Sequence, residues 1–181
     1  MKLTRIGFFT AALALSGVTA SAQDIQFGAH AGLNLPLGDL DTAVDGRMGY
    51  TIGGHVGLYY GNGHELRPRL DYTHYSGGWT PGHDQLFDKN TVSSLGVGAD
   101  YIFYTETRPQ GIYLVMGLGF QNWTVDHANA GNDSKTALSL AAGAGFRFNR
   151  SVSIEGRFTT GQFQSTNGQA NALQVIASMR F

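Results

Sequence analysis

The stretch LQVIASMRF, residues 173–181, alternates between apolar and polar side chains up to the last residue of the sequence. Its apolar residues share one parity: Leu173, Val175, Ala177, Met179 and Phe181. On the other parity, Ile176 is the only apolar residue. Successive side chains of a β-strand point to opposite faces, so this pattern predicts a strand between an apolar and a polar medium. Because the pattern reaches the final residue, we expect this strand to close a sheet.

Seven further segments show the same period of two. They are Ile25–Leu35, Met48–Tyr60, Glu65–Tyr75, Thr91–Phe103, Ile112–Asn122, Thr136–Phe148 and Val152–Thr160. Each is close to the roughly 9–11 residues that a tilted transmembrane strand needs. Beyond the first 22 residues, we find neither a helical period nor an apolar run long enough for a transmembrane helix. The sequence therefore predicts an all-β chain of eight strands.

The connections between these strands alternate in length. Those after the second, fourth and sixth strands are short: Gly61–His64, Tyr104–Gln110 and Asn149–Ser151. Those after the odd-numbered strands are longer: Pro36–Arg47, Ser76–Asn90, Trp123–Lys135 and Gly161–Asn171. Short turns on the periplasmic side and long loops outside are typical of outer-membrane barrels. We therefore expect an antiparallel up-and-down barrel with both termini in the periplasm.

The volume of the barrel decides which parity faces outward. A soluble, lipocalin-like barrel would turn its apolar parity inward around a ligand. An eight-stranded barrel has an interior just wide enough to be filled by side chains, and about five mostly large apolar residues per strand would not fit there. The opposite parity is rich in glycine, as at Gly28, Gly53, Gly117 and Gly143, which relieves crowding in a narrow interior. An apolar exterior belongs in lipid, where a closed sheet satisfies every backbone amide.

The inward parity also carries charge. We expect the following residues to form a polar network in the lumen: Glu65, Arg67, Arg69, Asp71, Asp100, Arg147, Glu155, Arg157 and Arg180, with His30 and His55 nearby. Unpaired charges in a narrow lumen would be costly, so mutual ion pairs and hydrogen bonds are predicted to plug the barrel. The alternative is a selective pore with an arginine-lined wall. The small width of eight strands favours the plug.

The first 22 residues have the three parts of an export signal. Lys2 and Arg5 form a positive region, Ile6–Val18 an apolar region, and Ala20–Ala22 a cleavage site of small residues. We therefore assign residues 1–22 to a cleaved signal peptide and residues 23–181 to one barrel domain. After cleavage 10 basic and 13 acidic side chains remain, a formal charge of −3 that does not suggest a nucleic-acid surface. The absence of cysteine excludes disulfides and thiolate chemistry.

With these features the chain resembles the small eight-stranded outer-membrane barrels of the OmpA/OmpX-like family. The terminal pattern Leu-x-Val-x-Ala-x-Met-x-Phe is similar to the signal read by the outer-membrane assembly machinery. The resemblance implies that Phe181, together with Met179, Val175 and Leu173, forms this assembly signal. It further implies a monomer in the outer membrane, in contact with lipid and lipopolysaccharide and served by periplasmic chaperones. No cofactor and no metal are expected.

One fragment is similar to a catalytic motif. Lipid A deacylases of the PagL type are small barrels that use a His-x-Ser pair on the outer surface, and His74 and Ser76 have this spacing. Those enzymes carry the motif near the end of the chain, usually followed by Asn, whereas Gly77 follows here. The acids available in the next loop, Asp84 and Asp88, have no assured geometry, although a catalytic base needs an orienting partner. An interfacial histidine without catalytic role is the simpler interpretation.

The loop aromatics Trp79, Phe87 and Trp123 are candidates for contacts with a partner or with lipid headgroups, or for packing of one loop on another. The sequence thus predicts a non-catalytic outer-membrane barrel with a structural or surface-interaction role. The first alternative is a narrow, porin-like channel for small solutes. The second is a lipid A-modifying barrel enzyme. Because one fold hosts many functions, the site must decide among them.

Overall fold

In a computed structural model of the chain, which describes residues 24–76, 91–127, 131–162 and 168–181, the strands form a closed barrel. The elements are β1 (Asp24–Leu37), α2 (Asp39–Ala43), β2 (Gly49–Gly61), β3 (His64–Tyr75), β4 (Thr91–Tyr104), β5 (Gly111–His127), β6 (Gly131–Arg147), β7 (Val152–Thr160) and β8 (Asn171–Arg180). The predicted eight-stranded, antiparallel, up-and-down barrel is confirmed. Among the described residues, no helix is long and apolar enough to cross a membrane.

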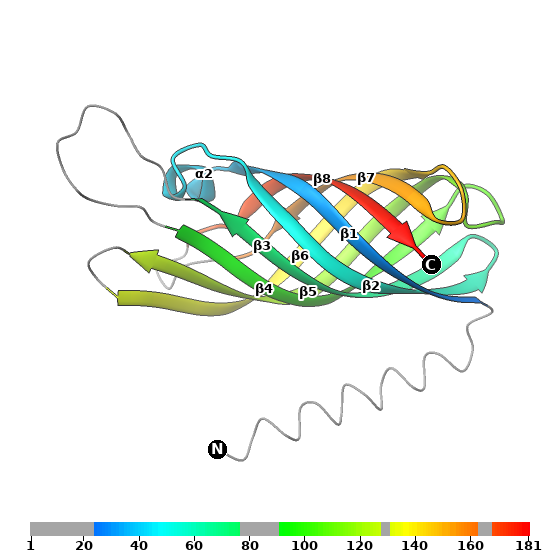
Figure 1. Ribbon diagram of the computed structural model, residues 1–181, viewed down its shortest axis with the longest axis horizontal. Coiled ribbons are helices and arrows are strands. Elements are labelled where there is room, and N and C mark those ends of the chain that lie inside the picture. The colour runs from blue at the N-terminus through cyan, green and yellow to red at the C-terminus, as the bar shows by residue number, and fades with distance from the viewer. Residues whose placement is uncertain (1–23, 77–90, 128–130, 163–167) are drawn as a thin grey trace, which may run out of the picture.

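Each strand pairs with the next along the chain, and β8 pairs with β1 to close the sheet (Figure 1). In this closing ladder Leu33 lies opposite Val175, and Gly28 lies opposite Arg180. The terminal strand therefore closes the barrel, as its alternation predicts. Closure pairs the first strand with the last, as a sheet must to be stable in lipid.

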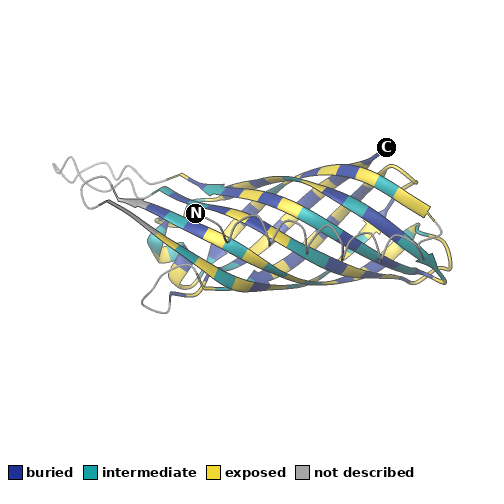
Figure 2. Cartoon of the chain, turned by 90° about the horizontal axis from the view of Figure 1, so that it is seen from below, coloured by how far each residue is buried: buried dark blue, intermediate teal, exposed yellow. Residues whose placement is uncertain are grey.

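Exposed and buried residues alternate along the strands, as the yellow and blue bands of Figure 2 show. The exposed large apolar side chains come from all eight strands and share the parity predicted to face outward. Met116 is 63 % exposed and Val175 is 56 % exposed, values that in water would be unfavourable for side chains of this size. The outer surface is thus an apolar belt that suits hydrocarbon.

The apolar belt ends sharply at one end of the barrel. On β5 the outward residues are apolar from Ile112 to Phe120, and the next one is Asn122. Asn122 Nδ2 donates a hydrogen bond to Thr136 Oγ1 of β6 at 3.2 Å. Thr160 Oγ1 of β7 likewise bonds to Asn171 Oδ1 of β8 at 2.7 Å. These polar pairs mark the rim where the membrane ends.

Two parts of the predicted long loops are regular structure. The connection Pro36–Arg47 contains the short helix α2, and the segment Trp123–Lys135 is largely the continuation of β5 and β6, each of 17 residues. Above the rim the outward parity meets water and the inward parity meets an apolar cluster. Beyond Asn122 the outward residues are therefore polar and the inward residues apolar, the reverse of the membrane-spanning part. The strands β5 and β6 continue although the alternation reverses.

The short turns lie at the opposite end of the barrel from α2 (Figure 1). In the β2–β3 turn Gly61, Asn62 and Gly63 all have positive φ, of 88°, 53° and 83°. Glycine and asparagine adopt this left-handed backbone most easily, which explains a turn of two residues at this position. In the β6–β7 turn, Asn149 Oδ1 accepts hydrogen bonds from the backbone nitrogens of Ser151 and Val152.

Candidate functional site

The interior of the barrel has three layers, and the outermost is apolar. It consists of Leu40, Val44, Tyr75, Val92, Trp123, Val125, Ala170 and Ala172, all buried. Leu40 comes from α2, which folds over the mouth. The Asp39 carboxylate accepts a hydrogen bond from the backbone nitrogen of Gln169 at 2.9 Å, which ties α2 to the approach to β8. This outer apolar cluster fills the mouth of the barrel on the loop side.

The position of Trp123 differs from one of its sequence interpretations. Trp123 was a candidate for contacting a partner or lipid headgroups, but only 4 % of the residue is exposed, and it packs in the outer apolar cluster. The reason is that inward side chains of β5 become apolar once the strand passes the rim. Trp79 and Phe87 lie outside the described residues.

The layer at the short-turn end is also apolar. Ile102, Tyr104, Tyr113 and Val115 are almost completely buried, and Tyr59 packs against them. The rings of Tyr104 and Tyr113 lie 5.4 Å apart, centroid to centroid. The phenol groups of both tyrosines point to carboxylates of the middle layer. This inner apolar cluster is therefore joined to the polar network through its hydroxyl groups.

Asp100 on β4 is the centre of the middle layer. Its Oδ2 accepts hydrogen bonds from Arg67 Nη2 at 2.7 Å and Nε at 3.2 Å, and lies 3.4 Å from Arg157 Nη1. Its Oδ1 lies 3.4 Å from Arg69 Nε. Three guanidinium groups from β3 and β7 thus share one carboxylate that is 1 % exposed.

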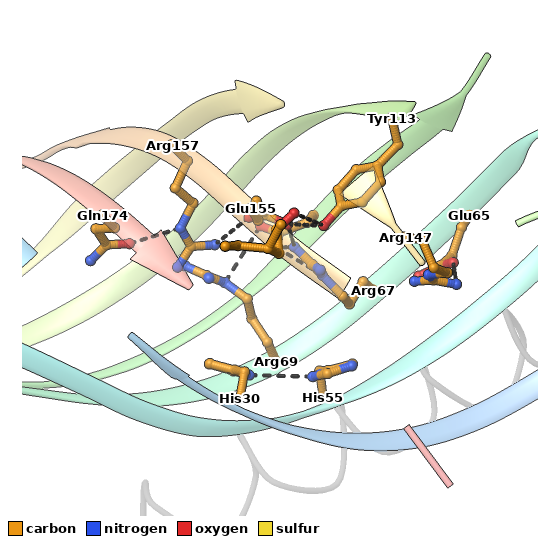
Figure 3. A network of polar contacts seen from close by, with 12 residues as sticks. His30, His55, Glu65, Arg67, Arg69, Tyr113, Arg147, Glu155, Arg157 and Gln174 are labelled. Carbon is orange, nitrogen blue, oxygen red and sulfur yellow. Dashed lines mark hydrogen bonds and ion pairs between the residues drawn. The ribbon is translucent and has the colours of Figure 1, made fainter. Parts of the chain in front are cut away.

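Glu155 on β7 connects the same arginines to the opposite wall. Its Oε2 accepts hydrogen bonds from Arg67 Nη2 at 2.8 Å and from the Tyr113 hydroxyl at 3.1 Å. Arg157 in turn donates from Nε to Gln174 Oε1 of β8 at 2.7 Å. Figure 3 shows these side chains converging from β3, β5, β7 and β8 on the barrel axis. The lumen is crossed by hydrogen bonds in this layer.

Glu65 on β3 is the second centre, nearer to the short turns. Arg180 of the terminal strand binds it with two nitrogens, Nη2 to Oε1 at 2.5 Å and Nη1 to Oε2 at 2.9 Å. Tyr104 donates its hydroxyl to Oε2 at 2.9 Å, and Arg147 Nη1 lies farther away, at 3.5 Å. A guanidinium that binds a carboxylate in this two-fold manner forms one of the stronger ion pairs in proteins.

The histidines of the interior complete the network on the β1–β2 side. His30 Nε2 lies 2.6 Å from Asp71 Oδ1, and His30 Nδ1 lies 3.3 Å from His55 Nδ1. Asp71 also binds Arg69 Nη2 at 3.0 Å. The structure therefore places all nine charged residues that the sequence assigns to the lumen inside the barrel, and each takes part in an ion pair there.

Sequence reasoning missed the neutral members of the network. Tyr104, Tyr113 and Gln174 supply hydrogen bonds to Glu65, Glu155 and Arg157. All three have the inward parity of their strands, and this parity was the signal that could have identified them. Cavities within the network, beside Asp100 and beside His30, are of about 10 Å³ each, the size of a single water.

The residues of the catalytic alternative lie outside the lumen. His74 is on the outward parity of β3, with its ring 5.3 Å from that of Tyr50 and 6.4 Å from that of Tyr72. Ser76 is exposed and follows β3 directly. His74 Nδ1 is buried and has no hydrogen-bond partner among the described residues, and Asp84 and Asp88 lie outside them. No described acid therefore orients this histidine for catalysis.

The described ranges contain no group of three or more His, Cys, Asp or Glu side chains arranged to hold a metal ion. The histidine pair and Asp71 are engaged with arginine and with one another. The interior side chains cross-link the strands, because their ion pairs and hydrogen bonds connect all eight strands across the barrel.

Residues 8–181 match the family model of the outer membrane protein beta-barrel domain. The chain belongs to this family. The predicted resemblance to small outer-membrane barrels and the outer-membrane location are thereby confirmed. A comparison of the sequence with curated proteins finds no significant match.

Similar solved structures support the family assignment at the level of the fold. Ail, the attachment invasion locus protein of Yersinia pestis, is 13 % identical with a TM-score of 0.54, over 87 % of this chain and 97 % of that one. Neisserial surface protein A is 17 % identical with a TM-score of 0.53, over 86 % and 95 %. The N-terminal β-barrel domain of Pseudomonas aeruginosa OprF is 17 % identical with a TM-score of 0.51, over 86 % and 97 %. At these identities the likeness concerns the fold alone.

The C-terminal residue of this outer-membrane barrel protein is bound through its backbone, and its side chain is largely exposed. Phe181 donates its N–H to the Phe27 carbonyl at 3.0 Å, while its residue is 81 % exposed. If Phe181 is the assembly signal, its deletion will slow insertion in cells several-fold and change the stability of the finished barrel little, because few contacts are lost. Pulse-chase formation of the heat-modifiable species measures the rate. Phe148→Ala, at another exposed aromatic of the same barrel end, is the control, and an unchanged rate in the truncated chain would make Phe181 a simple strand end.

Proposed function

We propose that this outer-membrane barrel is a non-catalytic protein with a structural and surface-interaction role, and that it does not conduct solutes. The observation that supports this most directly is the filling of the lumen: apolar clusters close both ends, and an ion-pair network crosses the space between them. A pore needs a continuous aqueous path, whereas each of the cavities within the network holds about one water. The apolar belt would contact lipid and lipopolysaccharide, and its completeness around all eight strands suits a monomer.

The surface role rests on the hairpin of β5 and β6, which extends beyond the rim. Five residues of β5 follow Asn122, and five residues of β6 precede Thr136. At about 3.3 Å per residue, the hairpin projects on the order of 15 Å above the rim along its strands. The long strand ladder, from His127 paired with Gly131 to Gly111 paired with Arg147, makes this projection continuous with the barrel wall.

The projecting hairpin also contacts the segment that follows β7. The ladder of β6 with β7 runs from Leu140 to Arg147, and farther along β6 Lys135 Nζ donates a hydrogen bond to Gln162 Oε1 at 3.2 Å. Ail, a barrel of the same fold, is named as an attachment invasion locus protein, which supports a surface role here. We therefore infer that the projecting hairpin contacts a surface partner.

An adhesion experiment with whole cells tests the surface role directly. Cells that produce the wild-type chain should bind to immobilised extracellular-matrix proteins more strongly than cells whose variant has residues 126–132 replaced by Asn-Gly. The shortened hairpin keeps Val125 and the outer apolar cluster, so equal amounts in the outer membrane are expected and must be verified by immunoblot. Equal binding by both strains would argue against a role of the hairpin.

Conductance separates this proposal from the narrow, porin-like alternative. The wild-type protein in a planar bilayer should stay at background conductance, because ion passage requires breaking the network around Asp100 and Glu65 and displacing both apolar clusters. A large, stable, ion-selective conductance would support the channel instead. An unchanged lipid A mass spectrum in producing cells is the corresponding expectation against a deacylase built on His74 and Ser76.

A further inference from the structure

A cavity of about 550 Å³ opens at the short-turn end of the barrel, below the inner apolar cluster. Its wall is built from the start of β1, the end of β2, the end of β6 and the two turns β4–β5 and β6–β7. In outer-membrane barrels this end faces the periplasm. The volume lies within the roughly 300–1,000 Å³ of typical small-molecule sites.

The charge of this periplasmic cavity is one-sided. Arg108, Arg147 and Arg150 line it, against the single carboxylate of Asp24. Asp24 Oδ2 already accepts a hydrogen bond from Gln26 Nε2 at 3.0 Å. Arg108 and Arg150 make no ion pair with any described carboxylate. Three guanidinium groups thus surround an open volume that offers them almost no counter-charge.

Arg147 is a second, independent observation that favours an anion in this cavity. Among the described residues the lumen holds five arginines and four carboxylates: Arg67, Arg69, Arg147, Arg157 and Arg180 against Glu65, Asp71, Asp100 and Glu155. Glu65 is engaged by Arg180 at 2.5 Å and 2.9 Å, which leaves Arg147 a contact of 3.5 Å. The residue is 1 % exposed, and its Nη2 has no hydrogen-bond partner in the described structure. A buried, incompletely paired guanidinium is costly unless something else neutralises it.

The turns that carry the other two arginines are held in place by hydrogen bonds. The Tyr59 hydroxyl donates to the Thr107 carbonyl, and Gln110 Nε2 donates to the Phe148 carbonyl at 3.3 Å. Asn149 caps the β6–β7 turn next to Arg150 through the backbone nitrogens at 2.8 Å and 2.9 Å. Arg147 itself is fixed by the ring of Tyr104, 4.9 Å from its Cζ. The backbone that carries Arg108 and Arg150 and the side chain of Arg147 are therefore held in place, which lowers the entropic cost of binding.

We propose that this cavity binds a multivalent oxyanion, a carboxylate- or phosphate-bearing ligand that reaches the barrel from the periplasm. Guanidinium groups bind both kinds of oxygen pair in a two-fold manner, and several of them around one volume favour a ligand with more than one negative charge. Arg147 would bind the group that enters most deeply, and Arg108 and Arg150 would bind those nearer to solvent. The source is a free small oxyanion or a carboxylate of a cell-wall peptide stem.

Calorimetric titration of the whole refolded barrel in zwitterionic micelles, at low ionic strength, tests this site. The probes are citrate, inorganic phosphate and soluble muropeptides with free carboxylates. The test variant is the double substitution Arg108→Gln and Arg150→Gln, whose residues are outside the lumen network. The matched control is Arg47→Gln, which removes one positive charge at the loop end of the barrel. We expect the double variant to bind citrate at least about tenfold more weakly than the wild type, and the control to bind it equally.

The three probes distinguish the sources. Binding of muropeptides that Arg108→Gln with Arg150→Gln abolishes would assign the site to the cell wall, whereas binding of citrate or phosphate alone would assign it to a free oxyanion. The ¹⁵N shift of the Arg147 side chain should move on binding in either case. The proposal is overturned if none of the probes binds, or if the double variant and Arg47→Gln bind all of them as the wild type does.

Discussion

Gly143→Ala is expected to prevent the barrel from closing. Gly143 of β6 lies opposite Arg157 of β7 in the ladder. A Cβ at this position would lie 2.6 Å from both Cα and Cβ of Arg157 and would also meet the carbonyl oxygen of Gly156. These are mainly backbone atoms, so no side-chain rotation relieves the overlap. The strand β7 would have to move, and in a closed barrel that movement breaks its pairing with β6 or with β8.

The expected magnitude of this effect is large because two costs add. Overpacking of an interior position costs about 1–3 kcal/mol, and more where backbone must shift. Displacement of β7 also moves Glu155 and Arg157 out of the network around Asp100. We expect Gly143→Ala to yield little of the heat-modifiable, folded species when the protein is refolded into micelles, and to lower the urea midpoint of the fraction that folds.

Gly156→Ala is the matched control for this prediction. Gly156 lies on the neighbouring strand, opposite Ala144, and faces outward, where an added Cβ meets nothing within 4 Å. The change should leave refolding intact or improve it slightly, since alanine restricts the unfolded chain more than glycine does. Equal refolding of both variants would show that the interior has more room at Gly143 than the structure indicates.

The membrane-spanning part of the fold could be predicted because the bilayer imposes a strict pattern. Between the rim and the short turns, an outward residue meets lipid and an inward residue meets the polar network, so alternation identifies both faces. The volume of an eight-stranded lumen then fixes which face is inside. For this reason the sequence indicates that Arg67, Asp100 and Glu155 face inward, from three different strands.

The pairing within the lumen could not be predicted in the same way. Which arginine binds which carboxylate depends on the stagger of the strands around the barrel, and a sequence with alternation alone leaves this stagger open. Glu65 thus binds Arg180, 115 positions away in the chain, and Asp100 binds Arg157 from β7. The stagger also decides that Arg147 is the arginine left with a weak partner, which directs attention to the periplasmic cavity.

The ends of the barrel were mispredicted because the medium changes there. At Trp123 and Val125 the inward face is apolar, whereas the outward face meets water, so the alternation reverses and the pattern suggests a loop. The inner apolar cluster of Ile102 and Tyr113 has the same cause at the other end. The polarity of a strand's side chains reflects the medium that they meet. It therefore distinguishes the inward from the outward face only where the medium on each side is known.

Glu65→Gln is expected to produce the largest loss of stability among single changes to the charged residues of the lumen. The carboxylate of Glu65 is completely buried and accepts hydrogen bonds from Arg180, Arg147 and Tyr104. Glutamine of the same size keeps one acceptor but turns N–H groups toward a guanidinium. It also removes the one carboxylate that pairs with Arg147 and Arg180 among the described residues. Breaking a buried ion pair from one side costs about 3–5 kcal/mol, and we expect a loss of this size in the free energy of unfolding, measured by urea titration in lipid vesicles.

A double-mutant cycle shows whether this loss arises from the pair itself. Glu65→Gln with Arg180→Gln removes both charges, so the double variant should be more stable than the sum of the single losses predicts, by about 1–3 kcal/mol. Glu106→Gln, on an exposed glutamate of the β4–β5 turn, controls for the chemical change and should leave the unfolding midpoint unchanged. Additive losses in the cycle would mean that Glu65 and Arg180 stabilise the barrel independently. The network would then act by filling the lumen, and the terminal strand would be held by its ladder with β1 and β7 alone.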